Sequence, residues 1–136
     1  MQIIDKIAFI HIVNGKILST RSKGKDKYYI PGGKRENNET DIQTLVREIK
    51  EELTVEIIES SAKMYGVFEA QAHGKADGVI VKMTCYTADF LGDLRADSEI
   101  AEIVWLDFAD IEMVSPVDKL IFKDLHNKGL ITYLRC

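Results

Sequence analysis

The chain has 136 residues, of which 46% are hydrophobic and 29% charged, as in ordinary globular domains and unlike collagen, disordered chains or disulfide scaffolds. Its 18 basic and 22 acidic residues give a net charge of -4, so we expect no general nucleic-acid binding through backbone phosphates. No segment has the composition of a linker, and residues 1–136 are predicted to form a single domain.

The N-terminus does not have the pattern of a targeting or membrane segment. Asp5 and Lys6 carry charges where a signal peptide would continue apolar. The longest apolar stretch, residues 7–13, is far too short to cross a bilayer. These features predict a cytoplasmic protein without a membrane partner.

The first segments predict a β-hairpin. Residues 6–13 and 16–21 are rich in β-branched and aromatic side chains, and the Asn14-Gly15 pair between them favours a type I′ turn. The following residues predict a loop, a short strand and a turn that ends it, at residues 22–27, 28–30 and 31–33 respectively.

The apolar period becomes helical over residues 42–53, where five side chains form one stripe: Ile42, Leu45, Val46, Ile49 and Leu53. Strand-like runs follow at residues 55–58, 63–71, 79–90 and 102–106. Trp105, in the last of these runs, is predicted to lie in the core.

A second helix is predicted to begin after Ser115, because Pro116 suits the first helical position and Asp118 lies three residues after the cap. Its apolar stripe comprises Leu120, Ile121 and Leu125. The order of hairpin, helix, strands and helix predicts a mixed α/β domain whose helices cover a sheet.

The first predicted helix carries three glutamates on its polar side. Glu48 and Glu52 are one turn apart, and Glu51 lies beside them. Clustered carboxylate oxygens are ligands that Mg²⁺ prefers. Taken alone, however, these glutamates are better explained as the solvated acidic face of a surface helix.

The flanking residues reverse this interpretation. Gly33 is followed after five residues by Glu39 and, after seven more, by the run Arg47-Glu48-Ile49-Lys50-Glu51-Glu52-Leu53-Thr54-Val55. This spacing resembles the Nudix box. The resemblance implies a Nudix-type α/β/α sandwich with a mixed β-sheet, acting as a Mg²⁺-dependent pyrophosphohydrolase, with Mn²⁺ as an alternative ion.

One position departs from the box, because Thr54 stands where the family has glycine. A glycine there suits a left-handed exit from the helix, which a β-branched residue adopts poorly. We therefore expect a different helix end, with the chain passing more directly into the strand at Val55. No ligand is removed by this change.

By this resemblance, Glu48 and Glu52 are the first candidates for metal ligands, Glu51 completes the cluster, and Gly33 supplies a backbone carbonyl. The resemblance further implies that these three glutamates are the catalytic ones. The residues that would support the site are Arg47, Glu39 and Gly32. An Arg–carboxylate link between the first two would hold the loop against the helix, and the glycine would allow a tight turn.

The catalytic base is assigned first to Glu51, with Glu99 and Glu102 as alternatives from a loop. The candidates for binding substrate are Arg21, Tyr28 and Tyr29. The arginine would meet phosphates and the tyrosines would stack on a base, although strand aromatics more often belong to a core and basic loops are as often merely solvated.

The implied substrate is a nucleoside diphosphate linked to another moiety, and NDP-sugars, ADP-ribose and (d)NTP-like nucleotides all stay open. Homodimers are common in the family, so a homodimer is a further expectation. Two alternatives remain: a catalytically silent Nudix-like nucleotide-binding or regulatory domain, and a domain whose acidic helix binds a cation for stability alone.

Overall fold

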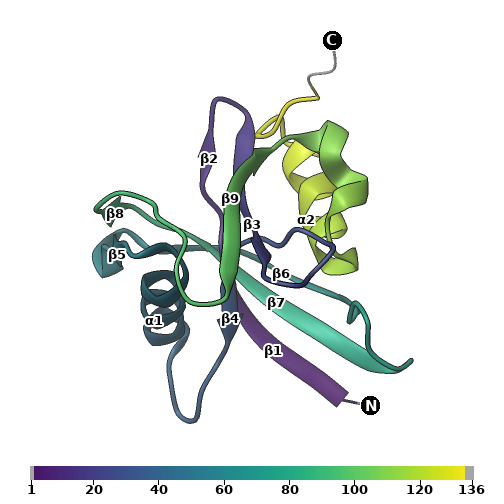
Figure 1. Cartoon of the computed structure of the whole chain (residues 1–136), viewed down its shortest axis with the longest axis horizontal. Helices are drawn as coiled ribbons and strands as arrows, with labels where there is room; N and C mark the ends of the chain where they lie inside the picture. The colour runs from purple at the N-terminus through teal and green to yellow at the C-terminus, as the bar shows by residue number, and fades with distance from the viewer. Residues whose placement is uncertain (1, 134–136) are drawn as a thin grey trace.

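A four-stranded mixed sheet lies at the centre of residues 2–133, the part of the chain that the computed structural model describes (Figure 1). The strands are β1 (Gln2–Phe9), β2 (Ile12–Val13), β3 (Lys16–Ser22), β4 (Gly32–Lys34), β5 (Glu56–Ile57), β6 (Lys63–Gln71), β7 (Val79–Thr87), β8 (Phe90–Leu91) and β9 (Ile100–Leu106). The helices are α1 (Asp41–Leu53) and α2 (Pro116–Asn127), with short 3₁₀ turns η1 (Glu59–Ser61) and η2 (Phe108–Met113). Within these residues, no helix combines the length and apolarity needed to span a membrane.

The central sheet has the strand order β4-β1-β7-β6. Strands β1 and β7 are parallel, whereas β4 pairs antiparallel with β1 and β6 antiparallel with β7. A second, antiparallel sheet has the order β2-β3-β9, and the two-residue strands β5 and β8 pair with each other. The predicted mixed sheet is therefore confirmed.

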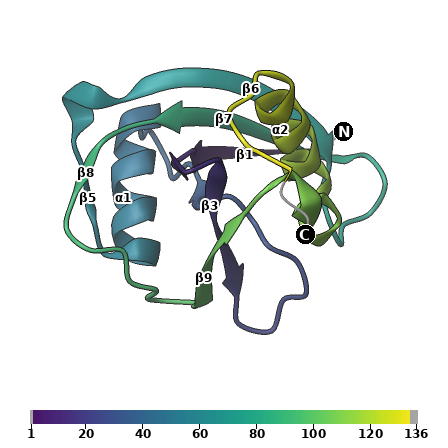
Figure 2. The ribbon, with the colours of Figure 1, turned by 90° about the horizontal axis from the view of Figure 1, so that it is seen from above.

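The two helices cover opposite faces of the strands because side chains alternate along β1. Ile7 and Phe9 belong to the hydrophobic cluster that includes Leu45 and Ile49 of α1. Ala8, between them, belongs to the cluster that holds the buried side of α2. Figure 2 shows β3 and β9 between the two helices, so the predicted α/β/α arrangement is confirmed.

The predicted hairpin is present, but its first strand is divided. Asn14 and Gly15 have φ values of 53° and 77°, as a type I′ turn requires, and they join β2 to β3. The predicted single strand over residues 6–13 is wrong, because β1 ends at Phe9 and the chain then enters the second sheet as β2.

The segment around Gly32 also differs from its prediction. Residues 28–30 make only isolated bridges. Gly32 and Gly33, which belong to the predicted turn over residues 31–33, instead begin strand β4 (Gly32–Lys34) against β1. Gly32 has φ of 147°, and a Cβ atom there would lie 2.0 Å from the carbonyl oxygen of Ile7. A glycine is thus required by close approach to β1 rather than by a turn.

The predicted end of the first helix is wrong. Thr54 adopts φ 61° and ψ 22°, the left-handed conformation that was expected to be avoided, and its N–H donates to the Lys50 carbonyl. Helix α1 therefore ends as if a glycine were present, although a side chain occupies the position.

Two predicted core residues are exposed. Trp105 is 38% exposed, and its ring lies 5.8 Å from that of His11. Leu120 is 40% exposed, whereas Ile121 and Leu125, the other two members of the predicted stripe, are buried. The buried residues of α2 are Val117, Asp118, Ile121, Phe122 and Leu125. This set includes one acid, Asp118, which is fully buried.

Candidate active site

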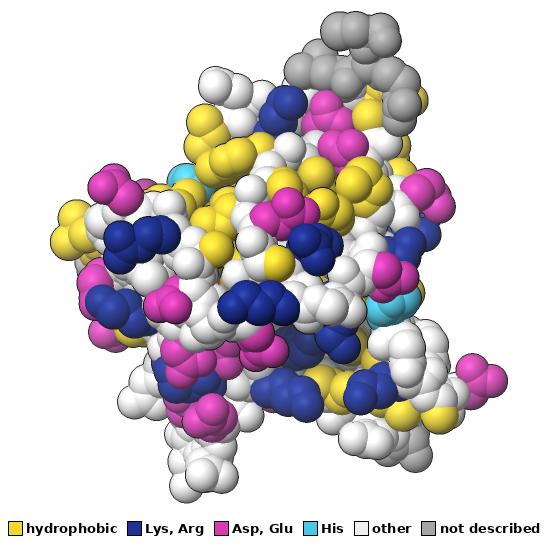
Figure 3. All heavy atoms as spheres, viewed as in Figure 1, with side chains coloured by type: hydrophobic (Ala, Val, Ile, Leu, Met, Phe, Trp, Pro, Cys, Tyr) yellow, Lys and Arg dark blue, Asp and Glu magenta, His cyan; other side chains and the backbone are white. Residues whose placement is uncertain are grey.

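A cleft of about 570 Å³ opens between the strands and helix α1. Its walls come from β1, β4, α1, the β3–β4 loop, the β6–β7 loop and the segment before β9. The charged side chains among its lining residues are Lys6, Lys25, Lys34, Arg35, Glu36, Glu48, Glu52, Lys75 and Glu99. On the face shown in Figure 3, basic and acidic side chains gather side by side below a mainly hydrophobic area.

Glu52 lies at the cleft with most of its side chain out of solvent. The Gly32 N–H donates to its Oε1 at 3.2 Å, which connects the end of α1 to β4. Burial raises the pKa of Glu52 to about 8, and the charges of Glu48 and Glu99 act in the same direction. The nearby positive charge of Lys6 lowers this pKa by less than desolvation raises it.

Glu48 packs directly against the backbone of β4. A Cβ atom on Gly33 would lie 2.3 Å from the Glu48 Cδ, so only glycine permits this contact. The side chain is 15% exposed, and Arg47 Nη1 donates to its Oε2 at 2.8 Å. Burial nevertheless raises the pKa of Glu48, since its effect exceeds that of the guanidinium.

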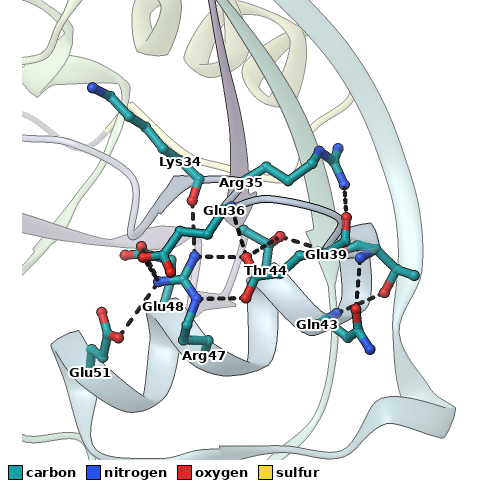
Figure 4. A network of polar contacts seen from close by, with 10 residues as sticks. Lys34, Arg35, Glu36, Glu39, Gln43, Thr44, Arg47, Glu48 and Glu51 are labelled. Carbon is teal, nitrogen blue, oxygen red and sulfur yellow. Dashed lines mark hydrogen bonds and ion pairs between the residues drawn. The ribbon is translucent and has the colours of Figure 1, made fainter.

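Arg47 is the centre of a network that joins α1 to the β4–α1 loop (Figure 4). Its Nε donates to Glu39 Oε2 at 2.7 Å and its Nη2 to Glu39 Oε1 at 2.9 Å. The same Nη2 donates to the Lys34 carbonyl at 3.0 Å. The bidentate link expected from the sequence is thus present, and the guanidinium lowers the pKa of Glu39 to about 2.

The third glutamate of the predicted cluster is placed differently. Glu51 is 50% exposed, lies 3.6 Å from Arg47 Nη1 and does not line the cleft. In the described range 2–133, no three His, Cys, Asp or Glu side chains lie close enough to hold a metal ion by themselves. The structure therefore brings two of the three predicted carboxylates to the cleft.

The two loop glutamates also have different surroundings. Glu99 lines the cleft, whereas Glu102 accepts hydrogen bonds from Arg21 Nε at 3.0 Å and from the Tyr28 hydroxyl at 2.5 Å. These bonds lower the pKa of Glu102. Of the three predicted substrate-binding residues, only Tyr29 lines the cleft.

Sequence reasoning missed most of the cationic lining. Lys6 interrupts an apolar strand, which was an available signal, and burial lowers its pKa despite the nearby charges of Asp118 and Glu52. Lys34, Lys75 and their neighbours come from separate segments, so their convergence depends on the topology of the sheet.

A smaller recess of about 110 Å³ adjoins the cleft and shares Lys6 and Tyr29 with it. Its apolar walls are Ile4, Ala72, Val81, Met83, Pro116 and Val117. Asp118 is buried beside this wall, where its Oδ2 accepts a hydrogen bond from the Ile30 N–H at 2.8 Å. The acid thus fixes the segment that presents Tyr29.

Asp118 is expected to make stability depend on pH. Burial raises its pKa from 3.8 to about 7, so between these values the folded chain keeps a proton that the unfolded chain has released. The free energy of unfolding should therefore fall as the pH rises from about 4 to 7.

The variant Asp118→Asn tests this expectation, because it keeps an acceptor for the Ile30 N–H and removes the titrating group. Urea unfolding at pH 5 and pH 8 should show wild type losing stability relative to this variant, and parallel behaviour would contradict the assignment.

The chain was compared with known families and structures. The family model described as NUDIX domain matches residues 5–125. The chain is similar to the solution structure of the E. coli ORF135 protein, with 28% identity, coverage of 95% of this chain and 92% of that chain, and a TM-score of 0.69. No curated protein sequence matches significantly.

More distant structures share the fold. The MutT protein from Methanosarcina mazei Go1 is 17% identical, with coverage of 94% of this chain and 96% of that chain and a TM-score of 0.75. A structure described as a UDP-X diphosphatase is 16% identical, with coverage of 95% of this chain and 64% of that chain and a TM-score of 0.65.

Proposed function

Because the chain belongs to the Nudix family of hydrolases, which generally use divalent metal ions and act on small nucleotide substrates, we propose that it is a Mg²⁺-dependent pyrophosphohydrolase. Its substrate would be a nucleoside diphosphate linked to another moiety, as in an NDP-sugar, ADP-ribose or a (d)NTP-like nucleotide. The observation that carries the proposal is the pair of partly buried, desolvated carboxylates, Glu48 and Glu52, at a cleft lined with lysines.

The donors at the cleft fit a hard divalent cation. Mg²⁺ is usually bound through one or two carboxylates, with water and substrate phosphate completing its shell, so Glu48 and Glu52 suffice. The Gly33 carbonyl would be a further ligand, and Mn²⁺ uses the same oxygen donors. When bound, such an ion neutralises phosphate charge and lowers the pKa of water for attack on phosphorus.

The lysines of the cleft would bind and orient the diphosphate. Lys6 and Lys34 come from adjacent strands, and Lys25 and Lys75 approach from two different loops, so cations face the cleft from several sides. Charge-assisted bonds from these groups to phosphate oxygens would fix the diphosphate beside Glu48 and Glu52.

The nucleoside part would lie toward the smaller recess. Tyr29 borders both the cleft and the recess, and its ring offers a stacking surface next to apolar walls. The recess is too small to hold a complete nucleoside, so it would receive an edge of the base while the remainder lies across the cleft.

Glu99 is the best placed of the three candidate bases. It lines the cleft near Glu52, whereas Glu51 is half exposed outside the cleft and Glu102 is bonded to Arg21 and Tyr28. In this role, Glu99 would accept the proton from the attacking water. Glu51 would then support the site through its proximity to Arg47.

A substrate panel tests the proposal. Purified protein is incubated with a UDP-sugar, ADP-ribose, a dinucleotide polyphosphate and the (d)NTPs, with Mg²⁺ or with EDTA, and products are separated by ion-exchange chromatography. We expect at least one compound to be cleaved within its phosphate chain only when Mg²⁺ is present. Binding without turnover across the panel would instead favour a silent nucleotide-binding domain, and EDTA-resistant cleavage would contradict the metal requirement.

A further inference from the structure

We propose that Thr54 is a positioning residue that holds the loop carrying Glu99 at the cleft. The inference rests on the proposed function, because it concerns the base assigned there. Thr54 is β-branched but has φ of +61°, where a branched side chain meets its own backbone and only glycine is free of strain. Such a conformation persists where surrounding contacts hold it.

The contacts that hold Thr54 come from the segment between β8 and β9. Its Oγ1 lies 2.5 Å from the Leu53 carbonyl oxygen and 3.2 Å from that of Arg95, so one hydroxyl proton serves both acceptors. The Arg95 N–H in turn donates to the Leu53 carbonyl at 3.0 Å. The end of α1 and the loop are therefore joined by hydrogen bonds in both directions, one from the Thr54 hydroxyl and one to the Leu53 carbonyl.

This connection satisfies the free carbonyls at the end of α1. The last carbonyls of a helix have no partner within it, and here the Asp97 N–H donates to the Glu52 carbonyl at 3.0 Å, beside the bond from Arg95 to Leu53. The loop is thus bound to the backbone of Glu52 itself, which carries one of the two partly buried carboxylates of the cleft.

The loop reaches the cleft two residues later, at Glu99. On its far side the Glu99 carbonyl accepts a hydrogen bond from the Lys23 N–H at 2.8 Å, which attaches it to the β3–β4 loop. Glu99 is therefore held from one side by the β3–β4 loop and from the other by the end of α1. A glycine at position 54 would keep the helix end but would lose the hydroxyl that binds the Arg95 carbonyl.

Three substitutions separate the hydroxyl from the backbone strain. Thr54→Gly removes both, Thr54→Val keeps the branch without the hydroxyl, and Thr54→Ser keeps the hydroxyl. We expect Thr54→Gly to retain or raise the melting temperature while kcat falls about tenfold at nearly constant KM, because Glu99 is displaced. Thr54→Val should lose both kcat and melting temperature, and Thr54→Ser should restore kcat. Asn14→Gly, which relieves a left-handed residue far from the cleft, is the matched control and should not change kcat.

Two further measurements show whether the effect passes through Glu99. Amide hydrogen exchange at Arg95 and Asp97 should accelerate in Thr54→Gly, a readout that needs no activity. In a Glu99→Gln background, Thr54→Gly should cause no additional loss of kcat. Full activity of Thr54→Gly with unchanged exchange would overturn the inference, as would additive losses in the double variant. An inactive wild type would instead refute the proposed function, so the two failures are distinguishable.

Discussion

Glu52→Gln is expected to lower kcat by at least about 10³-fold, because it removes a charge from the site proposed to bind the metal and substrate phosphates. The amide oxygen of glutamine can still accept the Gly32 N–H bond. The variant also eliminates a buried carboxylate whose pKa is raised to about 8. The measurement is steady-state turnover with the best substrate of the panel, with circular dichroism and melting temperature recorded on the same samples.

The control for this variant is Glu56→Gln, a neighbouring glutamate whose side chain is 57% exposed and pairs with Lys50. It should leave turnover unchanged. Desolvation makes the ionised Glu52 carboxylate unfavourable, so at a pH above its pKa of about 8 the melting temperature of Glu52→Gln in EDTA should equal or exceed that of wild type. Near-normal kcat in Glu52→Gln would refute the assignment of Glu52 to the metal site. An unfolded Glu52→Gln variant would contradict the expectation that glutamine is tolerated at this position.

Arg47→Lys is expected to lower kcat/KM by about 10- to 100-fold, the range found when residues that orient metal ligands are changed. Lysine keeps the charge but cannot form the two parallel bonds to Glu39 while also reaching Glu48 and the Lys34 carbonyl. Glu48 would then lose its fixed orientation. Activity should be measured as a function of Mg²⁺ concentration, and a raised Mg²⁺ requirement is the expected signature.

Glu39→Gln provides the comparison for this effect. If Arg47 acts through the loop that Glu39 anchors, the double variant should be little worse than Arg47→Lys alone, because both changes break one network. Fully additive losses, or an unchanged Mg²⁺ requirement in Arg47→Lys, would show that Arg47 does not orient the carboxylates.

The sequence was sufficient where the determining interactions are local. The stripe from Ile42 to Leu53 predicted helix α1 to within one residue, and the run over residues 63–71 coincides with β6. The resemblance to the Nudix box likewise implied a bidentate pair between Glu39 and Arg47, and the structure contains it. Periodicity and motif spacing depend on neighbours in the chain, so no tertiary knowledge was needed.

The remainder of the site depends on packing that a single sequence does not reveal. Strand β4 depends on the close approach of Gly32 to the backbone of β1. Glu51 lies outside the cleft because the packing of α1 against the sheet determines which side of the helix faces the cleft. Intrinsic propensity failed at Thr54, where bonds to the next loop outweigh the preference of a β-branched residue. Lys6 and Lys75 line the same cleft only because the folded sheet brings their segments together.

The most direct test of the account is binding of Mn²⁺, followed by electron paramagnetic resonance, to wild type and to Glu48→Gln, Glu52→Gln and Glu56→Gln. We expect wild type and Glu56→Gln to bind the ion alike, and we expect loss of either cleft carboxylate to weaken binding at least about tenfold. Equal binding by all four proteins would contradict the claim that Glu48 and Glu52 hold the metal.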